Sequence, residues 1–164
     1  MATIKCSDTE VVTTHRILGE DLNEHHTLFG GRLLSIVDAE ASIAAARLAN
    51  RVIVTASMDH VSFAHPFKLE DVLEMHAYVT GFGKRSIEVF VKVIGEHLLT
   101  GERFVGFTCF MTFVVADHEY QVPYDQVLAE TSEQEYLVST YQDRQAIRKP
   151  IRESEKAMLE HLAD

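Results

Sequence analysis

Alternation of apolar and polar residues marks two neighbouring stretches of the chain as half-buried β-strands. Every second position is apolar over residues 71–82, and residues 86–97 repeat this two-residue period. A period of two is the spacing of side chains on one face of a strand. Gly81 and Gly83 stand at the junction of the two stretches and favour a tight turn, so the pattern predicts an antiparallel hairpin.

Three further stretches have the composition of strands. Residues 9–18 are rich in β-branched side chains, and residues 51–64 form a long run that ends at His65-Pro66. Residues 102–116 are apolar at nearly every position, which is typical of a central strand covered on both faces.

Residues 31–49 contain no helix breaker and are rich in alanine and leucine, so they predict one long helix. At 100° per residue, its apolar side chains fall within an arc of about 120°, the width of a stripe buried against a core. This stripe consists of Leu33, Leu34, Val37, Ala41, Ala44, Ala45 and Leu48. Asp38 lies at its margin, where a carboxylate is costly unless it is hydrogen-bonded or has a task.

The order of these elements indicates an α+β fold in which an antiparallel sheet wraps around one long central helix. Residues 1–123 are expected to form this domain, and residues 124–164 a helical C-terminal extension. Two helical patterns in the extension are separated at or just before Pro150. A sheet packed on one helix leaves its other face and its edges uncovered, so a homo-oligomer is expected.

Composition and charge narrow the classes of protein to which the chain can belong. The 164 residues are 46% apolar, with 25 acidic and 15 basic side chains, and the net charge of −10 disfavours binding to nucleic acid. No stretch is apolar enough to span a membrane, so membrane insertion is not expected. The acidic start of the chain is unlike a signal peptide, which favours a cytoplasmic location.

Metal and cysteine chemistry find no support in the sequence. Two cysteines are too few for a disulfide framework, and the nine histidines lack the spacing of metal ligands, so no bound metal is expected. One local basic cluster stands near the C-terminus and consists of Arg144, Arg148, Lys149, Arg152 and Lys156. A solvated helix face and a local anion site are both open interpretations of this cluster.

Gly30 and Gly31 lie at the start of the predicted helix, where N–H groups are open and the helix dipole favours negative charge. A carbonyl oxygen bound there would be stabilised as it became an oxyanion, although a tight loop-to-helix turn would also explain the pair. Asp38 is a candidate general base or a solvated acid. Gly31 and Asp38 are about 10 Å apart along the helix, so two antiparallel helices from two chains would be needed to bring them to one carbonyl.

The run LNEHHTLFGGRLLSIVD, which carries Asn23, Gly30, Gly31 and Asp38, resembles the hotdog-fold acyl-CoA thioesterases of the bacterial acyl-CoA hydrolase group. The likeness continues in the same order through VTASMDHVSFAHPF, GFGKRSIEV, TGER and FTCFMTFVV. It implies a hotdog fold and the hydrolysis of acyl-CoA to a free fatty acid and CoA, with no cofactor beyond the CoA of the substrate.

The resemblance also implies a role for each matching residue. Asp38 would act as general base or nucleophile, the Gly31 amide would polarise the thioester carbonyl, and Asn23 would place the carbonyl or the water. The residues expected to contact CoA are Gly30, Gly83, Lys84, Arg85 and Ser86. The implied active site lies between two protomers, in dimers that often assemble into trimers of dimers.

Two positions depart from the family pattern. His26 stands where a glycine is common, and the hairpin that usually reads Gly-x-Ser-Ser here reads Gly83-Lys84-Arg85-Ser86. The contact of the first serine with CoA is therefore in doubt, and the two cations either offer charge to a CoA phosphate or are solvated turn residues.

Two other functions compete with thioester hydrolysis. A hotdog hydratase would pair His25 or His26 with Asp38, but the proline-glycine helix start of such enzymes is missing. A non-catalytic acyl-CoA-binding or sensor module would not need Asp38 at all.

Overall fold

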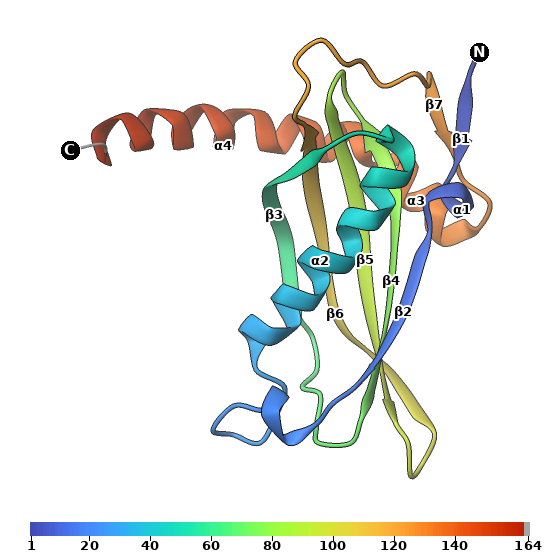
Figure 1. Ribbon diagram of the computed structural model, residues 1–164, viewed down its shortest axis with the longest axis vertical. Coiled ribbons are helices and arrows are strands. Elements are labelled where there is room, and N and C mark those ends of the chain that lie inside the picture. Colours follow the sequence, from blue (N-terminus) through green and yellow to red (C-terminus); the bar gives the residue numbers. More distant parts are fainter. Residues whose placement is uncertain (163–164) are drawn as a thin grey trace.

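The computed structural model describes residues 1–162 as a curved sheet with one long helix on its inner face and the C-terminal helices on its outer face (Figure 1). In chain order, the elements are β1 (Thr3–Lys5), α1 (Cys6–Thr9), β2 (Val11–Arg16), a 3-10 turn (Gly19–Asp21), α2 (Gly30–Ala49), β3 (Ile53–Phe63), β4 (Val72–Phe82), β5 (Ser86–His97), β6 (Glu102–Val115), β7 (Gln126–Leu128), α3 (Ser132–Ser139) and α4 (Tyr141–Leu162).

Five antiparallel strands form the main sheet in the order β2-β4-β5-β6-β3. The predicted hairpin is β4 and β5, and their bounds match the two alternating stretches within a residue. The strongly apolar β6 lies inside the sheet between β5 and β3, while β2 and β3 are its edges. The predicted α+β fold, an antiparallel sheet around one long helix, is confirmed.

The helix α2 runs unbroken over its 20 residues and buries its apolar stripe against the sheet. Asn50 ends the helix in a left-handed conformation with φ 49°, and its N–H donates to the carbonyl of Ala46 at 2.8 Å. Every predicted stripe residue except the half-buried Leu34 is buried. The stripe faces the inward side chains of β4 and β5, which are Leu73, Met75, Ala77, Val79, Ile87, Val89, Val91 and Val93.

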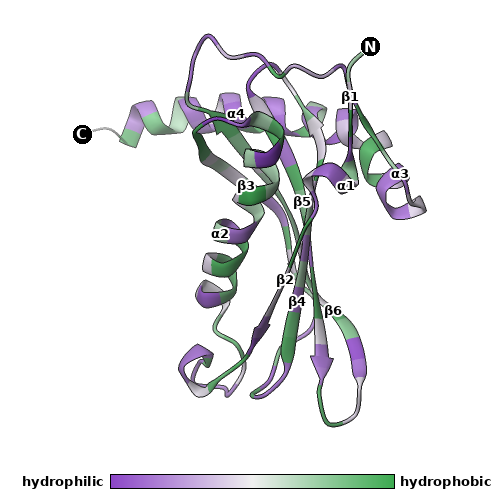
Figure 2. Cartoon of the chain, turned by 45° about the vertical axis from the view of Figure 1, so that its right-hand side comes forward, coloured by the Kyte–Doolittle hydropathy of each residue, from purple (hydrophilic) through white to green (hydrophobic). Residues whose placement is uncertain are grey.

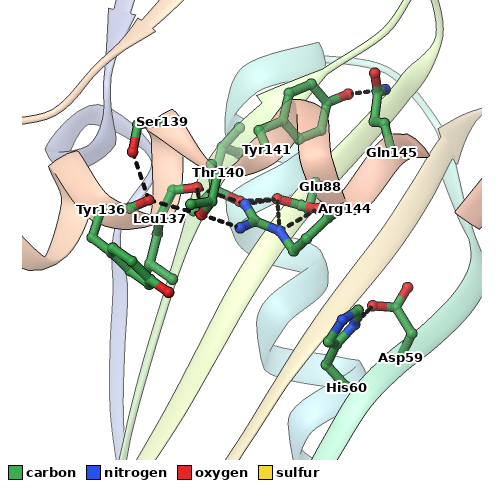
Figure 3. Close-up of polar contacts among 12 residues, drawn as sticks. Asp59, His60, Glu88, Tyr136, Leu137, Ser139, Thr140, Tyr141, Arg144 and Gln145 are labelled. Carbon is green, nitrogen blue, oxygen red and sulfur yellow. Dashed lines mark hydrogen bonds and ion pairs between the residues drawn. The ribbon is translucent and has the colours of Figure 1, made fainter. Parts of the chain in front are cut away.

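The C-terminal helices cover part of the outer face of the sheet. A second apolar cluster is buried there and consists of Cys6, Tyr78, Phe90, Phe110 and Leu137. Beside this cluster, Glu88 of β5 is buried and binds Arg144 of α4 (Figure 3). Glu88 also binds Arg148 of the same helix. The tail of this chain therefore covers a part of the outer face that the sequence analysis left for a second chain.

The break between α3 and α4 lies at Thr140, and the predicted break at Pro150 is wrong. α3 ends at Ser139, and the next residue, Thr140, donates to the carbonyl of Tyr136 from its hydroxyl at 2.8 Å and from its N–H at 3.2 Å. Pro150 lies inside α4, where it has no N–H for the carbonyl of Ala146. Because both residues are exposed, water can solvate that carbonyl, which makes the proline tolerable in this helix.

The distal half of α4 extends past the sheet, and its residues from 149 to 162 are exposed (Figure 1). Figure 2 shows hydrophilic and hydrophobic residues alternating along this segment.

Two short strands, β1 and β7, were missed by the sequence analysis, because three residues are too few to show a period. They pair with each other in parallel. The division of the chain at residue 123 stays a prediction.

Candidate active site

The start of α2 is shaped by the two glycines that the sequence analysis singled out. Phe29 precedes the helix in an extended conformation, and its N–H donates to the carbonyl oxygen of Asp21 at 2.8 Å. A Cβ atom on Gly31 would lie 2.7 Å from the Phe29 ring, whereas one on Gly30 would make an ordinary 3.6 Å contact with the Phe63 ring. The N–H groups of a first helical turn have no acceptor within the helix, so they can bind a ligand oxygen.

Asn23 organises the loop before α2. Its Oδ1 accepts the N–H groups of His25 at 2.9 Å and Thr27 at 3.2 Å, and its Nδ2 donates to the Thr27 hydroxyl at 3.1 Å. Within this loop His26 has a φ of 59°, the left-handed conformation that favours glycine. A glycine would adopt this conformation without strain, whereas His26 adopts it at a cost of about 1–2 kcal/mol.

Asn23 and Gly30 line a pocket of about 310 Å³ at this end of α2. The other lining residues are Thr27, Leu28, Leu33, Phe63, His65, Pro66 and Phe67. Because the lining combines apolar side chains with several polar groups, the pocket suits an organic ligand with a polar reacting group. The structure thus brings the predicted residue Asn23 next to the predicted glycine helix start.

Asp38 lies farther along α2 and is exposed in the single chain. Its Oδ1 accepts a hydrogen bond from the hydroxyl of Thr55 on β3 at 2.7 Å, which orients the carboxylate. Since α2 is continuous, Asp38 stays about 10 Å along the axis from Gly31, and one chain does not bring the two together. Thr55 was missed by the sequence analysis, because nothing in the sequence shows which strand residue faces Asp38.

The hairpin residues Gly83–Ser86 lie beside the opposite end of α2. The carbonyl of Arg85 accepts the N–H of Val115 at 3.0 Å, and Val115 pairs with Ile53, which follows the end of the helix. Arg85 also donates from Nη1 to the carbonyl of Val115 at 3.1 Å, while Lys84 is exposed. The predicted CoA-contacting residues of the hairpin and the glycine helix start are therefore separated by the length of α2 within one chain (Figure 1).

The C-terminal basic cluster divides into two groups. Arg144 and Arg148 are largely buried and bind carboxylates of their own chain, and Arg148 also reaches Asp59 of β3 at 2.6 Å. Lys149, Arg152 and Lys156 are exposed. Two of the five cations thus fasten α4 to the sheet.

The β3 edge of the sheet is exposed in the single chain and carries several apolar side chains. Among residues 1–162, β3 pairs only with β6, so its outer backbone groups are open. Several large side chains at or near this edge are exposed by about half, including Val54 at 52% and Phe63 at 56%. An open strand edge with exposed apolar side chains favours pairing with another chain.

Cysteine nucleophiles and metal ligands are not assembled near these residues. Cys6 and Cys109 are both buried, and this burial is the main cause that raises the pKa of each thiol to about 12. Over the described residues, no three His, Cys, Asp or Glu side chains are grouped so that they could hold a metal ion. No helix within residues 1–162 is both long enough and apolar enough to cross a membrane.

Comparison with known proteins shows that this chain is similar to thioester hydrolases. Residues 25–101 match the family model of the thioesterase superfamily. A Bacillus subtilis protein named as an uncharacterised acyl-CoA thioester hydrolase, YkhA, is 46% identical over 154 residues, which cover 93% of this chain and 90% of the relative.

Solved structures extend the likeness to three dimensions. An acyl-CoA hydrolase from Staphylococcus aureus, solved with butyryl-CoA, CoA and CoA disulfide, has a TM-score of 0.90 and 30% identity, and 99% of each chain is covered. The same protein has been solved with an aspartate, an asparagine or a threonine replaced by alanine. A hexameric acyl-CoA thioesterase has a TM-score of 0.86 and 34% identity, over 93% of this chain and 98% of that one.

Proposed function

This chain belongs to the thioesterase superfamily, and from that membership we propose that it hydrolyses acyl-CoA to a free carboxylic acid and CoA in an active centre built by two chains. The resemblance read from the sequence is thereby confirmed at the level of the family. The proposed substrate class is supported by the S. aureus structure with butyryl-CoA. The reaction needs only the thioester, water and protein groups, so we propose no cofactor, and a cytoplasmic location stays a prediction.

The observation that carries the assignment of residues is a pair of spacings. In the S. aureus hydrolase, the replaced asparagine precedes the replaced aspartate by 15 residues, and the replaced threonine follows that aspartate by 17. The same spacings separate Asn23 from Asp38 and Asp38 from Thr55. The three positions therefore match in spacing, and in this chain Asp38 and Thr55 are also joined by a hydrogen bond.

In the proposed mechanism, the thioester carbonyl oxygen accepts a hydrogen bond from the Gly31 N–H, which stabilises the oxyanion of the tetrahedral intermediate. The Asp38 carboxylate takes a proton from water as the water oxygen bonds to the carbonyl carbon. The carbon–sulfur bond then breaks, and the CoA sulfur receives that proton. Thr55 holds the carboxylate in place through its bond to Oδ1.

Two chains are proposed because one chain keeps these groups apart. An antiparallel pairing of two copies along β3 would place Asp38 of one protomer near the partner's Gly31. The same pairing would bring the hairpin Gly83–Ser86 of one chain towards the helix start of the other, where the CoA contacts are expected. The hexameric thioesterase supports a higher assembly, which we propose to be a trimer of dimers.

The central experiment follows CoA release with a thiol reagent across acyl-CoAs from acetyl to palmitoyl. Asp38→Asn is expected to lower kcat by a factor of about 10²–10⁴, because it removes the base but leaves the shape. Glu40→Gln is the matched control, since it removes an acid from the same helix two residues away. Wild-type turnover by Asp38→Asn would refute the assignment, and binding without turnover by the wild-type protein would favour the non-catalytic acyl-CoA-binding module.

A mixed dimer tests the two-chain centre. One chain carries Asp38→Ala and the other Gly31→Pro, so a centre shared between chains keeps one intact copy per dimer. We expect about half of the wild-type activity from the covalently linked mixed dimer. A complete loss, with both linked parent dimers also inactive, would place both groups in one chain.

A further inference from the structure

Asp21 is a buried carboxylate between β2 and the loop that leads into α2. It is 1% exposed, and its two oxygens receive three donors. Oδ1 accepts from Nε of Arg32 at 2.9 Å, while Oδ2 accepts from the N–H of Leu18 at 3.0 Å and lies 2.9 Å from Nε2 of His15. Burial alone opposes ionisation, but the bonds from Leu18, His15 and Arg32 lower the pKa of Asp21 to about 2.

The bonds of Asp21 reach both sides of the glycine pair. Its backbone carbonyl accepts the N–H of Phe29, directly before the glycines, at 2.8 Å. Its side chain holds Arg32, directly after the glycines, at 2.9 Å. Gly30 and Gly31 are the first two residues of α2 and have no side chains to restrain them, so these two flanking anchors add to the helix in fixing the direction of their N–H groups.

We propose that Asp21 is a positioning residue for the reacting carbonyl: its carboxylate holds Arg32 and thereby helps α2 to fix the direction in which the Gly31 N–H points. The bond from its backbone carbonyl to Phe29 supports the same segment and is kept in Asp21→Asn, so that variant tests the carboxylate alone. This inference rests on the proposed function, in which that N–H binds the thioester oxygen. A carboxylate is suited to the task because it accepts all three donors, whereas an asparagine offers one acceptor oxygen and adds donors of its own.

The first arm of the test separates positioning from stability. Asp21→Asn is compared with Asp71→Asn, which removes a second buried carboxylate. Asp71 is 5% exposed, and its carboxylate accepts the N–H of Lys68 and bonds the ring of His97. Asp71 makes no bond to Phe29 or Arg32, so it controls for the loss of a buried charge.

Kinetic constants for butyryl-CoA hydrolysis give the first readout. For Asp21→Asn we expect kcat to fall about 10- to 100-fold, with KM changed by less than about threefold, because the donor moves without the CoA contacts being lost. Asp71→Asn is expected to keep kcat within about twofold. Equal effects of the two variants on kcat would overturn the proposal.

A second arm needs no turnover. Calorimetry compares the affinities of two butyryl-CoA analogues: a ketone, in which a methylene replaces the sulfur, and S-butyl-CoA, a thioether without a carbonyl. If Asp21 acts through the carbonyl donor, Asp21→Asn lowers the ratio of ketone to thioether affinity about three- to tenfold. An unchanged ratio would overturn the proposal. A wild-type protein without turnover would refute the proposed function, while this ratio would still decide the role of Asp21.

Arg32 supplies the same test from a side chain that is 44% exposed, in case Asp21→Asn does not fold. Arg32→Ala is expected to lower kcat and the affinity ratio in the same direction. Arg32→Lys, which keeps the charge, is expected to recover part of both losses. Arg32→Ala with wild-type kcat and ratio would contradict the inference.

Discussion

The buried ion pair between Glu88 and Arg144 predicts how firmly α4 is attached to the sheet. Arg144 donates to both carboxylate oxygens of Glu88, at 2.7 and 3.1 Å, and the side chains are 8% and 2% exposed (Figure 3). The guanidinium also lies over the Phe110 ring, 4.1 Å from its centre. Arg144→Leu would therefore leave a buried carboxylate with Arg148 as its remaining cationic partner.

Removing one partner of a buried pair costs about 3–5 kcal/mol. Because Glu88 keeps Arg148 as a partner, we take the lower end of this range and expect Arg144→Leu to lower the free energy of unfolding by about 3 kcal/mol. Glu88→Leu is expected to cost a similar amount, since it leaves the buried Arg144 without its carboxylate, whereas Arg148 keeps Asp59. The double variant should cost about 2 kcal/mol less than the sum, because neither charge then remains buried alone.

Urea unfolding followed by circular dichroism, at one protein concentration, gives the four free energies of this cycle. The more exposed pair of Lys92 with Glu133 is the control, and Lys92→Ala is expected to cost less than about 1 kcal/mol. Additivity of the two leucine substitutions within about 0.5 kcal/mol would refute the reasoning. So would a cost for Arg144→Leu that is no larger than that of Lys92→Ala.

Three shorter predictions concern other parts of the chain. The lowered pKa of Asp21 adds about 2 kcal/mol of stability above pH 4, which is lost as the pH falls towards 2. Urea unfolding across this range should therefore show a loss for Asp21→Asn that is about 2 kcal/mol smaller than for the wild type, and equal losses would contradict this. Gly31→Ala should lower kcat at least about tenfold, because its Cβ would displace the Phe29 ring; unchanged kinetics would contradict this. Cys6 and Cys109, with pKa values raised to about 12 by burial, should react with a thiol reagent at pH 8 only after unfolding, and fast labelling of the native protein would show otherwise.

Local patterns predicted most of the fold. The α2 helix and the β4–β5 hairpin could be read from the sequence because burial on one face imposes a period of 3.6 or 2 on neighbouring residues. Asn23, Gly31 and Asp38 could be singled out because they occupy one short run with a family spacing. Their roles in catalysis stay predictions.

Contacts between distant residues could not be predicted in the same way. Glu88 and Arg144 are 56 residues apart, and Thr55 reaches Asp38 across 17 residues, so no local period relates the partners. The break at Thr140 has no glycine or proline to mark it in the sequence. Pro150 misled the prediction because solvent can satisfy the carbonyl that a proline leaves unpaired.

The continuity of α2 is the strongest argument for a shared active centre. The helix fixes the separation of Gly31 from Asp38 at about 10 Å, and no side-chain rotation can remove a distance set by the backbone. The hydrogen bond from Thr55 fastens Asp38 to β3, whose outer edge is open. Because Asp38 is held beside this open edge, a chain that pairs with β3 would lie close to its carboxylate. A second copy would present its own glycine helix start there, which is the group that the acid lacks in its own chain.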